Sequence, residues 1–219
     1  MKNYIIGIGG TGAKCLEHLL HCCTAGLGPN NLWAGMVDQD EANGNVSKTK
    51  ILLNKYMNLR SNLRNESGND LAKKSNLFKT QITANADSVW LPMKGANPTL
   101  EELINYNLLK PEVKGLMDCL YDPDELKQNL SEGFRARPNI GAAAILSTTA
   151  NEDDIFWSQI YKAIDAARGG EEVRVFIISS IFGGTGASGF PNIARRIRQI
   201  QKDKNVSSNF HLGGALMLP

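Results

Sequence analysis

A glycine-rich loop at the end of an apolar, strand-length run constrains the fold of this chain more than any other feature. The run 173–179 predicts a buried β-strand, and the loop after it holds Gly183, Gly184, Thr185, Gly186, Ser188 and Gly189. Glycines admit positive φ and let backbone N–H groups approach a ligand without an intervening Cβ. A helix that begins at such a loop directs its unpaired N–H groups and the positive end of its dipole at that ligand. The pattern therefore predicts an anion site, with phosphate as the expected anion.

A second loop of this kind lies near the start of the chain. Residues 3–8 predict a buried strand, and a helical pattern runs from Ala13 to about Gly26. The glycines between them have G-x-G-x-x-G spacing, which with Asp38 after the next predicted strand, 32–37, also fits a dinucleotide-binding fingerprint. A tight strand-to-helix turn favours glycine in any case, so one loop decides little. Two such loops, with a third between them that carries Arg135 and Arg137, favour a polyphosphate held by many donors.

The middle of the chain is organised by helix-start signals. The polar segment 44–97 is rich in Asn, Lys and Ser and predicts an insertion over one edge of the domain. Thr99-x-x-Glu102 predicts a capping box, and Pro111 predicts the first turn of a second helix. Asp122-Pro123 predicts the start of a third helix, which we expect to end near Gly133.

Three further elements are predicted in the last third of the chain. A helix is expected from Asn151 to the glycines at 169–170. Pro191 is expected in the first turn of the helix that follows the second glycine loop. The apolar run 210–218 predicts another buried strand.

Composition excludes some classes of function without naming one. The formal net charge is only +2, which gives no electrostatic case for nucleic acid or a membrane surface. The N-terminus has neither a signal-peptide pattern nor a membrane-spanning stretch, so we expect a cytoplasmic protein. The four cysteines lack metal-type or disulfide-type spacing and predict reduced, packed thiols.

No metal site or hydrolase nucleophile is predicted. His18, His21 and Cys22 lie on adjacent turns of one predicted helix, but no fourth ligand is spaced to join them. The hydroxyl residues and His211 show no nucleophile elbow, so the catalytic residues remain unknown.

The loops together resemble those of the tubulin/FtsZ family. Residues 183–191 are similar to the family's signature loop, GGGTG[TS]G, followed by a proline. Residues 7–13 resemble its first glycine loop, and Asp40 falls where the family has an acidic residue after its second strand. Residues 137–141 resemble its third phosphate loop, and the order of all four motifs matches.

This resemblance implies an α/β fold: a three-layer, Rossmann-like and mostly parallel sheet of the tubulin/FtsZ N-terminal GTPase-domain type, over residues 1–219. The implied function is binding of GTP or GDP by a module of a self-assembling, divergent bacterial protein. In the family the neighbouring subunit supplies the acidic loop for hydrolysis. That loop, the central helix and the C-terminal domain would lie beyond residue 219, so any GTPase activity is expected in the full-length or assembled form.

The resemblance also implies a set of site residues. The phosphates would be held by residues of the three loops and the helix starts: Gly9, Gly10, Thr11, Gly12, Lys14, Arg137, Asn139, Gly183, Gly184, Thr185, Gly186 and Ser188. Asp40 would lie near the terminal phosphate or a Mg²⁺ held through water. Lys14 stands where FtsZ-like proteins carry Asn and could add a charge-assisted contact. The expected partners are a guanine nucleotide and a second copy or another protein.

Two alternatives remain open at this stage. An NAD(P)- or FAD-dependent oxidoreductase would use the first loop and place Asp38 on a ribose. A protein-interaction module with a decayed nucleotide site would explain why Phe182 replaces the first signature glycine and Ser188 a later one. The sequence does not distinguish guanine from adenine.

Overall fold

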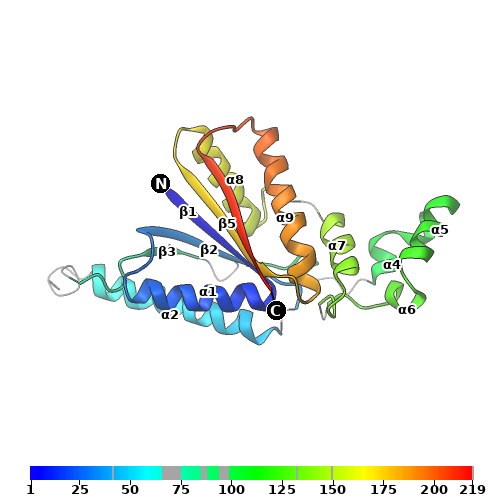
Figure 1. The fold of residues 1–219 in the computed structure, drawn as a ribbon, viewed down its shortest axis with the longest axis horizontal. Helices are drawn as coiled ribbons and strands as arrows, with labels where there is room; N and C mark the ends of the chain where they lie inside the picture. Colours follow the sequence, from blue (N-terminus) through cyan, green and yellow to red (C-terminus); the bar gives the residue numbers. More distant parts are fainter. Residues whose placement is uncertain are drawn as a thin grey trace.

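One parallel sheet forms the centre of the domain. The computed structural model describes residues 1–40, 42–65, 75–84, 88–93, 99–131, 133–148 and 150–218 (Figure 1). Within these ranges, six strands are found: β1 (Lys2–Ile8), β2 (Asn31–Val37), β3 (Gln81–Thr83), β4 (Val89–Trp90), β5 (Val173–Ser180) and β6 (Phe210–Met217). Their order is β3-β2-β1-β5-β6, with β4 also pairing with β2, and every pairing is parallel.

Helices cover both faces of this sheet, which confirms the three-layer α/β prediction. The helices α1 (Gly9–Thr24) and α2 (Gly44–Asn65) lie on one face, and α8 (Ile155–Arg168) and α9 (Gly184–Asp203) on the other (Figure 1). Alternate residues of β1 enter the two layers, since Ile6 packs with the α8 and α9 side while Ile5 packs with α1. Burial on both faces explains the near-continuous apolar runs that predicted these strands.

The sheet register brings the two glycine loops together. Ile6 pairs with Ile177 and Gly7 with Ile178, so the neighbouring strands β1 and β5 end at the same edge. Because the strands are parallel, the helices that follow them both begin there. Two loops that lie more than 170 residues apart in the chain are thus adjacent in space.

The described part of segment 44–97 packs closely against the α1 side of the sheet. The helix α2 spans 44–65 and buries Val46, Leu53 and Tyr56 against the α1 side of the sheet. The Tyr56 hydroxyl donates to the Thr80 carbonyl at 2.9 Å, ahead of β3. Residues 66–74, 85–87 and 94–97 lie outside the described residues.

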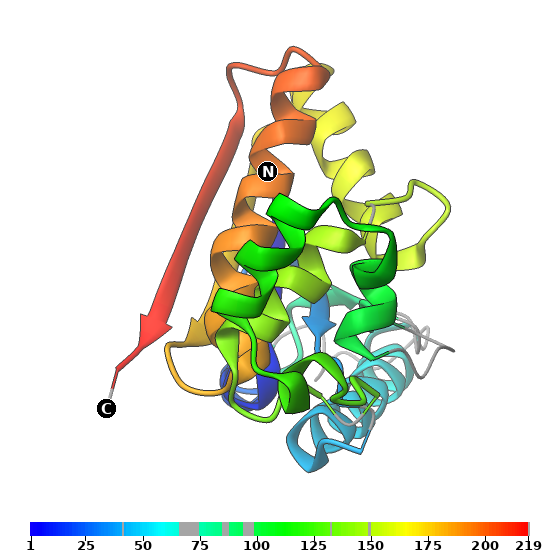
Figure 2. The same ribbon diagram turned by 90° about the vertical axis from the view of Figure 1, so that its right-hand side faces the viewer.

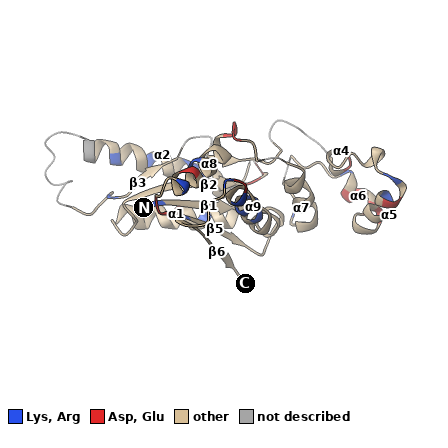
Figure 3. Cartoon of the chain, turned by 90° about the horizontal axis from the view of Figure 1, so that it is seen from above, with Lys and Arg blue, Asp and Glu red and all other residues tan. Residues whose placement is uncertain are grey.

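The segment that projects from the body is 99–131 instead. It contains α4 (Leu100–Leu103), η1 (Tyr106–Leu108), α5 (Pro111–Leu120) and α6 (Pro123–Leu126). These short helices extend past α7 (Pro138–Ser147), away from the sheet (Figures 1 and 2). Seen from above, the end of this projection around α5 and α6 contains both acidic and basic residues (Figure 3).

The capping residues of two short helices were predicted correctly. The capping box of Thr99 and Glu102 is confirmed, and Asp122 caps α6 with Pro123 in its first turn. However, α6 ends at Leu126, well before Gly133. The helix expected from Asn151 begins after Asp154, whose carboxylate accepts from the Phe156 and Trp157 N–H groups.

The helix α9 also differs from its prediction. It begins at Gly184, so Pro191 lies in its interior and not in its first turn. Proline has no N–H, so the carbonyl four residues earlier loses its intrahelical donor there. Gly183, with φ of +79°, sets the start, because the chain turns there before the helix begins.

The strand β6 is correctly located but is not buried. Phe210 is buried, whereas Leu216 and Met217 are about 40% exposed. Burial depends on strand order, and β6 is the last strand on its side of the described sheet. Separately, no helix in the described ranges is both long and apolar enough to cross a membrane.

Candidate functional site

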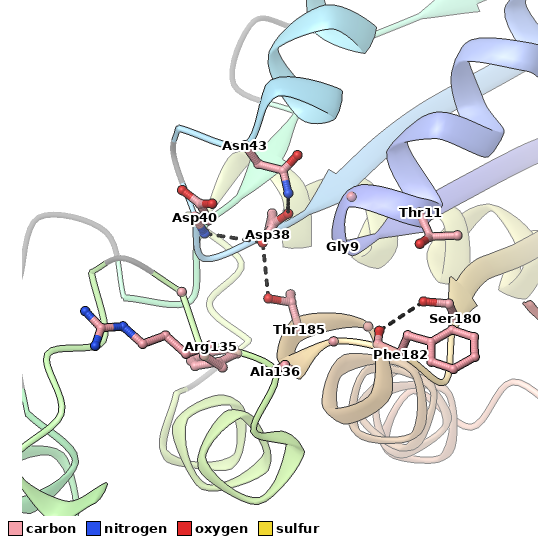
Figure 4. Close-up of a pocket in the computed structure, with 16 residues that line it drawn as sticks. Gly9, Thr11, Asp38, Asp40, Asn43, Arg135, Ala136, Ser180, Phe182 and Thr185 are labelled. Atoms are coloured by element: carbon pink, nitrogen blue, oxygen red, sulfur yellow. Dashed lines mark hydrogen bonds between the residues drawn. The ribbon is translucent and has the colours of Figure 1, made fainter. Parts of the chain in front are cut away.

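A polar cavity lies where β1, β2 and β5 end. Its volume is about 230 Å³. Four loops line it, contributing Gly9, Gly10, Thr11, Asp38, Asp40, Asn43, Gly133, Phe134, Arg135, Ala136, Ser180, Phe182, Gly183, Gly184, Thr185 and Gly186 (Figure 4). This edge of a parallel α/β sheet is where such folds bind their ligands.

The two glycine loops are in direct contact at the centre of the cavity. Gly9 has φ of +70°, and a Cβ built on it would lie 3.3 Å from the Gly186 backbone nitrogen. The Ser179 hydroxyl donates to the Ile8 carbonyl at 3.1 Å and ties the two strand ends together. The glycines therefore allow the starts of α1 and α9 to approach one another.

Neither of these helix starts is capped by a side chain. Ile8 precedes α1 and Gly183 precedes α9, and neither position gives a capping hydrogen bond in the described structure. The first N–H groups of a helix have no intrahelical acceptor. Two such sets of donors, each at the positive end of a helix dipole, thus meet at one cavity.

Asp38 connects the second strand to the second glycine loop. Its Oδ1 accepts from the Thr185 hydroxyl at 3.1 Å and from the Asp40 N–H at 3.3 Å. Its Oδ2 accepts from the Asn43 amide at 2.9 Å (Figure 4). Burial raises the pKa of the Asp38 carboxyl above its ordinary 3.8, although the hydrogen bonds from the Asp40 N–H and the Thr185 hydroxyl oppose the shift. With 2% of the residue exposed, this carboxylate organises the cavity wall.

The third loop approaches the cavity in a strained conformation. Gly133, Arg135 and Ala136 have φ of +83°, +43° and +59°. The Arg137 N–H donates to the Phe134 carbonyl at 2.8 Å, which closes a turn around Arg135 and Ala136. Positive φ at both central residues is typical of type I′ turns and is unfavourable for residues with a Cβ. Local strain of this kind is common at functional sites.

Eight of the predicted site residues line the cavity. They are Gly9, Gly10, Thr11, Asp40, Gly183, Gly184, Thr185 and Gly186. Five others do not line it: Gly12, Lys14, Arg137, Asn139 and Ser188.

Most of these five residues make contacts elsewhere that explain why they do not line the cavity. A Cβ on Gly12 would lie 2.6 Å from the Ile178 carbonyl oxygen, so this glycine lets α1 pack against the sheet. The Arg137 Nη1 pairs with Glu125 at 3.2 Å. The Ser188 hydroxyl donates to the Gly184 carbonyl within α9. Lys14 is exposed on α1.

The fifth residue, Asn139, lies on the outside of its helix start. Its carbonyl accepts from the Tyr121 hydroxyl at 3.3 Å, which links α7 to the projecting segment. The cavity is approached instead by Arg135 and Ala136 of the same loop.

Eight cavity residues were not in the predicted set, namely Asp38, Asn43, Gly133, Phe134, Arg135, Ala136, Ser180 and Phe182. Asn43 follows Asp38 by five positions, and its amide gives the carboxylate its third hydrogen bond. Ser180 is the last residue of β5, and Phe182 stands in the sequence where the signature has a glycine. Asp38 was assigned to the alternative ribose contact. A search for polar residues at strand ends would have found Ser180 and Asp38.

The fold and the cavity define a class: a parallel α/β domain with an anion-type cavity between two glycine loops. A family model described as tubulin-like matches residues 4–219, nearly the whole chain. The chain belongs to this tubulin-like family, which confirms the resemblance found in the motifs. Neither the curated proteins nor the solved structures gave a match.

Proposed function

We propose that this domain binds GTP or GDP, with the phosphates held between the two glycine loops. The observation that carries the proposal is the meeting of two uncapped helix starts at one cavity. A diphosphate or triphosphate supplies several anionic oxygens that can accept from both sets of N–H groups. Membership of the tubulin-like family supports guanine as the base.

Each loop has a distinct part in the proposed complex. The N–H groups of residues 9–11 would hold one phosphate, and those of residues 184–186 another. Thr11 is exposed and lines the cavity beside the first set. The Thr185 hydroxyl donates to Asp38 here, so its donation to a phosphate requires a change of partner.

A Mg²⁺ ion would depend on the nucleotide for some of its ligands. The described residues contain no group of three or more His, Cys, Asp or Glu side chains able to hold a metal ion. Mg²⁺ is often bound by one or two carboxylates together with phosphate oxygens and water. Asp40 lines the cavity beside Asp38 and would contribute through water.

Hydrolysis and self-association extend this proposal to the assembled protein. The cavity residues supply donors and carboxylates, but we assign none of them a catalytic role. We propose that turnover requires groups from a neighbouring subunit or from further chain, as the family resemblance implies. Cytoplasmic location and a bacterial source remain expectations of the same kind.

The oxidoreductase alternative is disfavoured by the contacts of Asp38. A ribose-binding carboxylate must offer its oxygens to the ligand hydroxyls. Both Asp38 oxygens already accept protein hydrogen bonds, and the residue is 2% exposed. The Asp38 carboxylate therefore serves contacts within the protein and not a ribose.

Thermal unfolding with separate ligands tests the proposal. GDP or GTP with Mg²⁺ should raise the melting temperature, while NADH should not, because only a bound ligand stabilises by RT ln(1 + [L]/Kd). Thr11→Glu, which places a carboxylate at the phosphate cradle, should remove the shift. Lys14→Ala, outside the cavity on the same helix, is the matched control and should retain it. A shift with NADH and none with GTP or GDP would overturn the proposal.

A further inference from the structure

Phe182 occupies an unusual position for an aromatic side chain. It lies between the end of β5 and the start of α9, lines the cavity and is 51% exposed. Most phenylalanines bury far more of their surface. An aromatic ring that remains in solvent beside a polar cavity is available for a ligand.

The backbone holds this residue at the cavity rim. The Ser180 hydroxyl donates to the Phe182 carbonyl at 3.0 Å, which fixes the turn after the strand (Figure 4). Gly183 follows with φ of +79°, and a Cβ built on it would meet no atom within 4 Å. The chain turns sharply here beside open space.

The two ends of the cavity differ in chemistry. Asp38, Asp40 and Arg135 lie at one end, and Phe182 lies at the other, beside Ser180 and Thr11 (Figure 4). The glycine loops lie between these ends. The N–H groups of these loops are the donors for phosphate, so an aromatic part of the same ligand would lie toward the end that holds Phe182.

The cavity has room for only one of the two parts of such a ligand. At about 230 Å³ it is smaller than typical sites for whole small molecules, which begin near ~300 Å³. A polyphosphate fills this open cavity, whereas a complete nucleotide is too large for it. The nucleoside must then extend past the rim, where Phe182 lies.

We propose that the half-exposed Phe182 ring at the cavity rim is a stacking platform for the base of the bound nucleotide. The inference rests on the proposed function and adds an aromatic contact to the backbone cradle. Every base has a π-face, so stacking on one ring does not select between guanine and adenine. Selection of guanine would then come from other groups.

The competing explanation is that Phe182 fills phosphate space in a decayed site. The two explanations differ in which part of the ligand the side chain affects. A stacking ring contributes to binding of the nucleoside and leaves inorganic pyrophosphate unaffected. A blocking ring weakens both ligands, and its removal improves both.

Calorimetric titration of GDP, ADP and inorganic pyrophosphate into matched variants separates these cases. Phe182→Leu keeps an apolar side chain but removes the ring, and should weaken GDP and ADP about tenfold while changing pyrophosphate less than about twofold. Phe182→Trp should retain GDP affinity. Ile181→Ala is the control, because Ile181 is 45% exposed beside Phe182 but does not line the cavity.

Three outcomes would overturn the inference, and they are distinguishable. If Phe182→Leu binds GDP as tightly as the unaltered protein, the ring does not stack on the base. If Phe182→Gly binds both GDP and pyrophosphate more tightly, the ring blocks the site. If the unaltered protein binds neither ligand, the proposed function fails and the stacking role fails with it.

Discussion

The two helices that begin at the glycine loops differ from the helices that begin elsewhere, including α2, whose first N–H groups donate to the Asn43 side chain. The helices α6 and α8 are capped by Asp122 and Asp154, whose carboxylates accept from first-turn N–H groups. The helices α1 and α9 begin at glycine loops and receive no side-chain cap in the described structure. Proteins usually satisfy helix N-termini locally. The first N–H groups of α1 and α9 are therefore available for an acceptor on a bound ligand.

The remaining helix starts refine this comparison. The short helix α4 has a full capping box, whereas α5 and α7 begin with a proline and lack a side-chain cap. Proline removes one of the N–H groups that would need an acceptor. Among the described helices of ten residues or more, α1 and α9 combine a glycine loop, an uncapped start and a place at the cavity.

The largest expected effect is on the packing of α1 against the sheet, in the first turn after its uncapped start. Gly12→Ala should lower the free energy of unfolding by about 3 kcal/mol or more, because the new Cβ would meet backbone atoms of Gly7 and β5 within 3 Å. Urea unfolding monitored by circular dichroism would measure the change.

Gly115→Ala in α5 is the matched control for this substitution. No atom lies within 4 Å of the Cβ position at Gly115, so the change should stabilise the protein by up to about 1 kcal/mol. Equal effects at the two glycines would contradict the packing role given to Gly12.

The next effect concerns the hydroxyl at the start of α9. Thr185→Val removes the donor to Asp38 and should destabilise the ligand-free protein by about 1–3 kcal/mol, the cost of leaving a buried acceptor without its partner. Thr185→Ser keeps the hydroxyl and should lose less. A valine variant as stable as the serine variant would show that the hydrogen bond contributes nothing.

This substitution should also change the pH dependence of stability. The raised pKa of Asp38 means that the folded protein keeps its proton at pH values where the unfolded carboxyl, with a pKa near 3.8, has lost it. Stability associated with this group therefore falls as pH rises from 3.8 through the raised pKa. Because Thr185 lowers that pKa, the loss in Thr185→Val should grow as pH rises over this window. Denaturant unfolding at a series of pH values measures it, and a loss that shrinks would contradict the assignment.

A smaller effect is expected at a side-chain-capped helix. Asp154→Ala should cost about 1 kcal/mol of stability, since it removes the acceptor for the Phe156 and Trp157 N–H groups. Asp154→Asn, which can still accept, should be nearly neutral. Neither variant should change the affinity for GDP measured by calorimetry. A loss of GDP affinity in both variants would contradict the conclusion that only the uncapped helix starts serve the ligand.

The smallest effect concerns the strained turn that faces the uncapped helices. Ala136→Gly should stabilise the ligand-free protein by about 0.5 kcal/mol, because glycine relieves the cost of the left-handed conformation but loses more entropy on folding. Ala142→Gly, in the regular helix α7, should instead destabilise by about 1 kcal/mol. Thermal unfolding of both variants would check the opposite signs.

The sequence was most informative where structure is decided by neighbouring residues. Apolar runs followed by glycines located β1, β5 and both cavity loops, and Thr99-x-x-Glu102 located a capped helix. It was less informative where burial depends on distant elements. The polar segment that contains α2 suggested an insertion, but one face of that helix packs against α1.

The sequence by itself determined the strand, glycine loop and helix succession and the family, because each motif is a local pattern of backbone freedom and apolar spacing. Only the tertiary structure decided which loop residues face the cavity. Strand order and register placed Gly9 against Gly186, turned Gly12 into a packing contact and brought Asp38 to Thr185, 147 positions later in the chain. No local pattern encodes such distances, because they arise only when the parallel strands pair and the helices pack across them.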